Sequence, residues 1–194
     1  MAEMVRKPRV LEKAQEEVRQ VWNERGYIDE SVVEELEYLK AVIKETLRLH
    51  PPAPLLSPRE CTQPCEINGH TIREKTQVFV NVWAIERDPN YWTSSSSSSS
   101  YSAEEFAPER FMNSSVDYRG SNFEYIPFGA GKRGCPGMLY GPAIGEILLA
   151  NLLCYFDWEL PSGITPETLD MTELMGSTIK KKDNLILVPT PHHI

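Results

Sequence analysis

The glycine-rich segment from Pro127 to Gly137 restricts the backbone of this chain more than any other. It reads Pro-Phe-Gly-Ala-Gly-Lys-Arg-Gly-Cys-Pro-Gly, with four glycines, one cysteine and two basic residues in eleven positions. Glycine at this density predicts a backbone that turns tightly and approaches another group closely. An apolar run follows, so we expect Cys135 just before a helix N-terminus, where unpaired amides and the helix dipole favour a thiolate. A thiolate beside Arg133 suits a soft metal ligand with an acidic group nearby.

Five positions of this segment match the pattern F-x-x-G-x-R-x-C-x-G, namely Phe128, Gly131, Arg133, Cys135 and Gly137. The segment therefore resembles the heme-binding loop of the cytochrome P450 family. The resemblance implies that Cys135 is the axial thiolate on the iron of heme b and that Arg133 pairs with a heme propionate. A phosphate-binding loop is disfavoured, because the sequence lacks both the Gly-Lys-Ser/Thr ending and a dinucleotide G-x-G-x-x-G after a buried strand. A structural cysteine before a helix is the other alternative.

Two helices are expected in the N-terminal quarter. Apolar residues recur at helical spacing after Pro8, and Gly26 ends that run. A capping box at Ser31-x-x-Glu34 predicts the start of a second helix, which Pro51-Pro52 ends.

Glu45 and Arg48 lie about 60° apart on this second helix, which would ordinarily indicate a solvated ion pair. Their context, Lys-Glu-Thr-Leu-Arg-Leu-His-Pro-Pro, resembles the E-x-x-R signature of the P450 family. Pro108-Glu109-Arg110-Phe111 resembles the segment that supplies a third partner. The resemblance implies a buried structural network of Glu45, Arg48 and Arg110.

The resemblance also implies contacts with a substrate and with heme outside the cysteine loop. Residues 53–60 carry prolines at 54 and 58 and cannot be helical; in the family this segment passes over the heme. Arg59 is expected to contact a propionate, with an ordinary surface arginine as the alternative. The candidate substrate contacts are Ala53, Leu55, Leu56, Leu174 and Met175.

Short strands and one apolar helix complete the expected elements. Asn68-Gly69 predicts a hairpin over 65–72, and 77–82 is expected to be a buried strand. The segment 157–160 is expected to be a strand, and 178–181 is expected to pair with 185–188. The helix after Cys135 is expected over 138–156, where Pro142 would kink it if it began at Gly137. Glu86 stands where members of the family usually have glycine.

Seven consecutive serines, Ser94 to Ser100, form a low-complexity segment that is expected to be a flexible loop. Four cysteines in 194 residues do not form a disulfide framework and favour a reducing compartment. Cys61-x-x-x-Cys65 lacks a second ligand pair at zinc-site spacing. The net charge of −8 argues against nucleic-acid binding. The sequence has neither an apolar run of about 18 residues nor a signal peptide, so we expect no N-terminal membrane anchor in this chain.

These features predict a mainly α fold with small β-sheets (α+β). The resemblance implies one partial domain over residues 1–194, the C-terminal heme-binding portion of the P450 fold. By the same resemblance, we expect the N-terminal half and the central oxygen-activating helix to be absent from this chain; the motif of that helix, A/G-G-x-D/E-T, does not occur in the sequence. No catalytic residue is therefore expected in this chain.

The surrounding sequence is most similar to plant microsomal members that oxidise secondary metabolites. The implied parent reaction is hydroxylation of a lipophilic small molecule by O2, with electrons from an NADPH-dependent reductase, at the cytosolic face of the endoplasmic reticulum membrane. This chain alone is expected to be inactive. Two alternatives remain open: a heme-thiolate isomerase or dehydratase, and a non-catalytic truncated product without heme.

Overall fold

The computed structural model describes residues 1–96, 99–176 and 178–193. Seven α-helices and two 3-10 helices lie in the described part of the chain: α1 (Ala2–Arg6), α2 (Pro8–Arg25), α3 (Glu30–Val33), α4 (Glu37–Leu49), α5 (Val82–Ile85), α6 (Pro89–Trp92), η1 (Pro108–Phe111), η2 (Gly131–Arg133) and α7 (Tyr140–Tyr155).

The described strands form five antiparallel pairs of two strands each. They are β1 (Arg59–Glu60) with β4 (Gln77–Val78), β2 (Cys65–Ile67) with β3 (His70–Ile72), β5 (Ser94–Ser96) with β6 (Ser99–Tyr101), β7 (Phe156–Glu159) with β10 (Val188–Pro191), and β8 (Glu173–Leu174) with β9 (Lys180–Lys181). The predicted mainly α fold with small sheets is confirmed.

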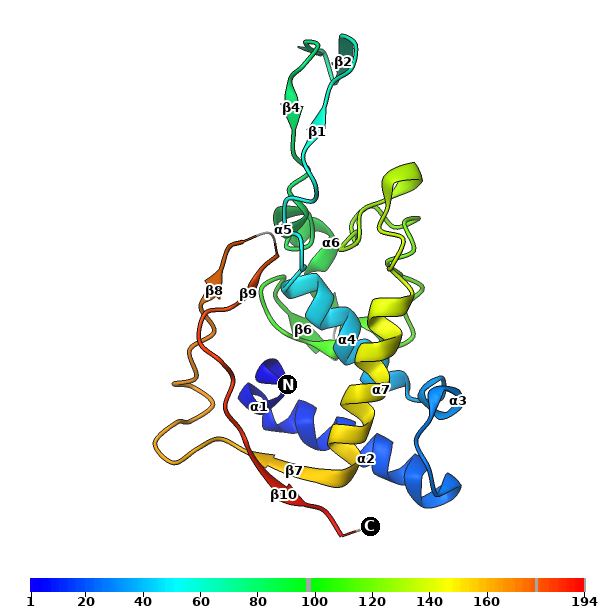
Figure 1. Cartoon of the computed structure of the whole chain (residues 1–194), viewed down its shortest axis with the longest axis vertical. Coiled ribbons are helices and arrows are strands. Elements are labelled where there is room, and N and C mark those ends of the chain that lie inside the picture. Colours follow the sequence, from blue (N-terminus) through cyan, green and yellow to red (C-terminus); the bar gives the residue numbers. More distant parts are fainter. Residues whose placement is uncertain (97–98, 177, 194) are drawn as a thin grey trace.

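Helices α2, α4 and α7 pack together and form the main core of the molecule (Figure 1). Val18 of α2, Leu39 of α4 and Leu153 of α7 are completely buried in it. A second core beneath α4 is aromatic and contains Trp92, Phe111, Tyr118 and Tyr125. In contrast, β1 to β4 form an arm that extends away from the helical body (Figure 1).

The first predicted helix is confirmed, since α2 begins at Pro8 and ends before Gly26 with a φ of 79°. The predicted start of the second helix, a capping box at Ser31, was wrong. Asp29, not Ser31, caps the short helix α3 by accepting hydrogen bonds from the amides of Ser31 and Val32. A new helix, α4, then begins at Glu37.

The separate start of α4 has a tertiary cause. The carboxylate of Glu17 on α2 accepts hydrogen bonds from the backbone amides of Tyr38 and Leu39, at 2.7 and 2.9 Å. An anion at this position satisfies unpaired amides and complements the helix dipole. The cap therefore comes from another helix, which local sequence patterns do not reveal.

Pro142 is accommodated without a kink in the hydrogen-bond ladder because α7 begins at Tyr140, with Leu139 as its N-cap. Pro142 thus lies in the first turn, where no backbone donor is needed. The expected start of this helix was two residues too early.

Three strand predictions need correction. The expected buried strand over 77–82 is reduced to β4, whose residues are not buried because it lies in the projecting arm. The C-terminal strands do not pair with each other, since β9 pairs with β8 and β10 pairs with β7. Within its described residues, the serine tract contributes to the paired strands β5 and β6 instead of an irregular loop; residues 97–98 lie outside the described residues. The hairpin at Asn68-Gly69 is confirmed.

Candidate functional site

The loop before α7 presents Cys135 at the surface. The backbone amide of Cys135 donates a hydrogen bond to the carbonyl of Phe128 at 2.9 Å, which closes the loop on itself. The ring of Phe128 packs edge-on against Tyr118, with ring centroids 5.4 Å apart. The aromatic core thus anchors the start of the loop, while the Cys135 side chain is left exposed.

Glycines make the course of this loop feasible. Gly129 and Gly131 have φ values of 73° and 67°, in the left-handed region that side chains disfavour. A Cβ on Gly137 would lie 3.8 Å from the Cys135 sulfur, so glycine keeps the surroundings of the sulfur open. A Cβ on Gly129 would lie 3.4 Å from the Leu56 side chain, which packs on the loop backbone.

The fold places Arg59 next to Arg133 of the cysteine loop. The Arg59 guanidinium donates a hydrogen bond to the carbonyl of Arg133 at 3.3 Å. Both arginines are exposed. Two cationic side chains therefore lie beside the cysteine loop, although 74 residues separate them along the chain.

The candidate substrate contacts divide between two places. Leu55 and Met175 line one surface hollow of 330 Å³, together with Trp83 and Ile179. Leu56 instead faces the cysteine loop, and the carbonyl of Ala53 accepts a hydrogen bond from the Leu56 amide. Leu174 pairs with Lys180 between β8 and β9 and is not part of the hollow.

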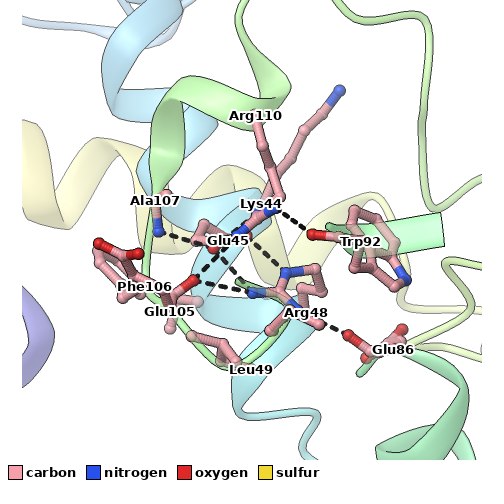
Figure 2. Close-up of polar contacts among 12 residues, drawn as sticks. Lys44, Glu45, Arg48, Leu49, Glu86, Trp92, Glu105, Phe106, Ala107 and Arg110 are labelled. Carbon is pink, nitrogen blue, oxygen red and sulfur yellow. Dashed lines mark hydrogen bonds and ion pairs between the residues drawn. The ribbon is translucent and has the colours of Figure 1, made fainter. Parts of the chain in front are cut away.

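The structure brings Glu45, Arg48 and Arg110 into contact in the interior (Figure 2). Arg48 donates to both carboxylate oxygens of Glu45, at 2.7 and 2.9 Å, and Arg110 donates to Glu45 at 3.1 Å. Glu45 and Arg48 are completely buried. Burial lowers the pKa of Arg110, which the Glu45 carboxylate partly offsets.

Backbone carbonyls complete this network. Arg48 also donates to the carbonyls of Glu86, Ala103 and Glu105, and Glu45 accepts the amide of Ala107 at 2.8 Å. Arg110 donates to the carbonyls of Trp92 and Ser102. The three side chains thereby hold the irregular chain from 86 to 110 against α4, as Figure 2 shows for most of these partners.

Glu86 is a structural residue whose role the sequence did not reveal. Its side chain is completely buried, and its Oε1 atom accepts a hydrogen bond from the amide of Ile126 at 3.0 Å. Ile126 lies two residues before Phe128, so Glu86 fixes the entrance to the cysteine loop. Burial raises the pKa of Glu86 to about 9, against the influence of Arg48 and Arg87. In the sequence, the visible sign of this role was that Glu86 stands where members of the family usually have glycine.

A helical fold with small sheets, a buried Glu-Arg-Arg network and a glycine-rich cysteine loop defines a P450-type protein. The sequence model of the Cytochrome P450 family matches residues 1–188. The chain therefore belongs to this family. Among solved structures, a zebrafish cytochrome P450 with abiraterone superposes with a TM-score of 0.80 at 28% identity, over 100% of this chain and 42% of that one.

Curated plant relatives are more similar. Desmethyl-deoxy-podophyllotoxin synthase of Sinopodophyllum hexandrum is 56% identical over 193 residues, and premnaspirodiene oxygenase of Hyoscyamus muticus is 55% identical over 192. Tabersonine 16-hydroxylase 2 of Catharanthus roseus is 53% identical over 193 residues. The alignments include 99–100% of this chain but 36–37% of the relatives, so the chain spans little more than a third of their length. It corresponds to their C-terminal part.

Relatives of this chain are thus P450 hydroxylases and oxygenases, and family membership implies a heme cofactor. Among the residues that the structure describes, no helix combines the length and the apolar character needed to span a membrane.

Proposed function

We propose that this chain is the heme-binding portion of a plant heme-thiolate monooxygenase, in which the Cys135 thiolate would bind the heme iron. The main support for this proposal is that the Cys135 side chain is exposed on a loop of defined shape. A backbone hydrogen bond and two glycines with left-handed φ values define that shape. Exposure of a thiol at the end of a rigid loop suits metal ligation better than a packing role.

The chemistry of the surrounding residues fits heme b. This cofactor needs a soft ligand for iron, an open approach to it, and cations for two carboxylates. Cys135 supplies the thiolate, Gly137 leaves its surroundings open, and Arg59 and Arg133 supply cations beside the loop. When bound, heme supplies the redox and oxygen chemistry, while the protein supplies ligation, orientation and electrostatics.

Each group of residues has a distinct part in this proposal. The Cys135 thiolate would hold the iron and donate electron density to it. Arg59 and Arg133 orient the propionates. Leu55 and Met175, which line the hollow of 330 Å³, contact part of a lipophilic substrate. Glu45, Arg48 and Arg110 keep the chain between α4 and the loop in place.

We assign the reaction to the whole protein and not to this chain alone, because the curated relatives are almost three times as long as this chain. The assigned reaction is the oxidation of a lipophilic plant metabolite by O2, with electrons from an NADPH-dependent reductase, at the cytosolic face of the endoplasmic reticulum. The relatives with 53–56% identity support this, because their names include synthases, oxygenases and hydroxylases.

The test is reconstitution of the chain with hemin, followed by reduction and addition of carbon monoxide. A thiolate ligand is expected to give a strongly red-shifted Soret band in the difference spectrum. Cys135→Ala is expected to lose this band, whereas Cys65→Ser, at an exposed thiol in the arm, is expected to keep it. The same band in Cys135→Ala, or none in the wild-type chain, would overturn the assignment.

A further inference from the structure

Two cysteines outside the candidate site face each other in the arm. The sulfur atoms of Cys61 and Cys65 are 3.8 Å apart, within contact distance. Cys65 is exposed and Cys61 is partly exposed, so both thiols can react with a solute. The heme-thiolate proposal uses neither of them.

Strand pairing holds the two cysteines in this arrangement. The Cys61 amide donates to the carbonyl of Thr76 at 2.9 Å, and the Cys61 carbonyl accepts the amide of Lys75 at 2.7 Å. Cys65 lies opposite Ile72 in the β2–β3 pair. Both cysteines are thus anchored to the same returning segment, residues 72–76, and their side chains meet because of the fold.

The two thiols are also chemically linked. The hydrogen bond with Cys61 raises the pKa of Cys65, with further contributions from burial and from charge on Cys61. A raised pKa disfavours the thiolate of Cys65, so the pKa does not by itself make this thiol reactive. The geometry favours reversible oxidation, because two solvent-accessible thiols lie in contact with each other.

We propose that Cys61 and Cys65 form a redox-active dithiol that closes reversibly to a disulfide by exchange with a low-molecular-weight disulfide such as oxidised glutathione. One cysteine thiolate attacks the glutathione disulfide, forms a mixed disulfide and releases one glutathione thiolate. The second cysteine then attacks the protein sulfur of the mixed disulfide and releases the other glutathione. Two protein thiols lose two electrons, and one glutathione disulfide gains them and takes up the two protons.

A metal site is the less favoured use of this pair. Among the described residues, no group of three or more His, Cys, Asp or Glu side chains is arranged to hold a metal ion. Two thiolates alone leave half of a tetrahedral coordination sphere open. Disulfide formation needs no further residue, only a shorter distance between sulfurs that already touch, to about 2.05 Å.

The pair can be measured separately from Cys135 and Cys154. Cleavage after arginine and lysine releases the peptide 60–73, which contains Cys61 and Cys65 and no other cysteine. The whole chain is equilibrated in a series of reduced and oxidised glutathione mixtures, quenched in acid and alkylated. As the mixtures become more oxidising, we expect the doubly alkylated peptide to be replaced by an unalkylated peptide. The mass of this peptide should be two hydrogens lower than that of the reduced, unalkylated peptide, as an internal disulfide requires.

The denatured chain in concentrated urea is the reference for the contribution of the fold. Because the fold holds the sulfurs in contact, half-oxidation of the folded chain is expected in a mixture about tenfold more reducing than the denatured chain requires. Coincident curves, or glutathione adducts in place of the internal disulfide, would overturn the proposal.

Single substitutions provide the controls. Cys61→Ser and Cys65→Ser are each expected to leave one thiol that takes up glutathione and forms no internal bond. Cys154→Ser removes the buried cysteine of α7 and is expected to leave the transition unchanged. Since none of these readouts involves heme, the result does not depend on the proposed monooxygenase function.

Discussion

Glu86 carries a completely buried carboxyl group whose Oε1 atom accepts a backbone hydrogen bond and whose Oε2 atom has no hydrogen-bond partner among the residues that the structure describes. The groups around it are Arg48, Arg87 and Tyr125. Burial dominates and raises the pKa of Glu86 to about 9. The folded chain therefore keeps this proton at pH values where the unfolded chain has lost it, so the free energy of unfolding falls as the pH rises from about 4.5 to about 9.

Replacement of Glu86 by glutamine is expected to remove this pH dependence while keeping the acceptor for the Ile126 amide. Wild type and Glu86→Gln should be similarly stable near pH 4.5, and the variant should be more stable by about 3 kcal/mol at pH 7. Thermal unfolding across this pH range measures the difference.

The exposed Glu74→Gln is the matched control and is expected to follow the wild type at every pH. A constant difference between Glu86→Gln and the wild type would contradict the raised pKa.

Arg48 makes five hydrogen bonds from a completely buried position, two of them to one carboxylate. Lysine has the charge but not the planar fork, so Arg48→Lys leaves several buried acceptors without donors. We expect a loss of about 3–5 kcal/mol in the free energy of unfolding, measured by urea denaturation.

The exposed pair Arg25–Glu35 provides the comparison, because its side chains are 48% and 46% exposed. Arg25→Lys is expected to cost less than about 0.5 kcal/mol. Equal effects of Arg25→Lys and Arg48→Lys would show that the buried network does not hold the fold.

How much of the site could be predicted from the sequence depended on the kind of residue. Cys135 and Arg133 could be singled out because their spacing is a local pattern, and their contacts with heme stay a prediction. The Glu45–Arg48 pair was also predicted from a local pattern, and the two side chains are in contact in the structure. The cap of α4 by Glu17 and the bond from Glu86 to Ile126 were missed because both are contacts between segments far apart in sequence. Strand pairing at the C-terminus failed for the same reason, since β10 joins β7 across almost 30 residues.

The C-terminal end of α4 connects two other elements through His50. Its ring contacts Glu3 of α1 at 2.9 Å and Glu173 of β8. Burial opposes the charged ring, but hydrogen bonds with both glutamates outweigh it and raise the pKa of His50. The charged imidazolium therefore joins α1 and β8 to α4, and it also lies favourably at a helix C-terminus.

His50→Gln is expected to be less stable than the wild type by about 1–2 kcal/mol between about pH 5 and 6, where the ring is charged and its glutamate partners are ionised. A raised folded pKa means that this stabilisation is complete below the unfolded pKa and is lost as the pH rises through the folded pKa. The difference in melting temperature between the two proteins should therefore shrink toward alkaline pH.

His70→Gln on the arm is the control for loss of an exposed histidine. A difference in melting temperature between wild type and His50→Gln that grows toward alkaline pH would contradict the proposed role of charged His50 in joining α1 and β8 to α4.

Helix α7 exposes an apolar face. Ile144, Leu148 and Leu152 follow one another at four-residue spacing on α7 and are 41%, 59% and 37% exposed. Leu139 and Tyr140 extend this surface at the start of the helix. A contiguous apolar surface of this kind promotes association between molecules in water.

Leu148→Gln is expected to reduce concentration-dependent association of the chain and to change its stability by less than about 0.5 kcal/mol, because the side chain is already exposed. Sedimentation velocity over a concentration series measures the association. Ile186→Gln, at an exposed apolar residue outside α7 (67% exposed), should have a smaller effect. If both variants associate like the wild type, the apolar face of α7 does not cause the association.

The proposed bond between Cys135 and iron is tested most directly by X-ray absorption at the iron edge of the heme-loaded chain. We predict one sulfur neighbour in the first coordination shell of ferric iron, retained in Cys65→Ser and replaced by a nitrogen or oxygen neighbour in Cys135→Ala. A first shell without sulfur in the wild-type chain, or an unchanged sulfur neighbour in Cys135→Ala, would contradict the heme-thiolate assignment.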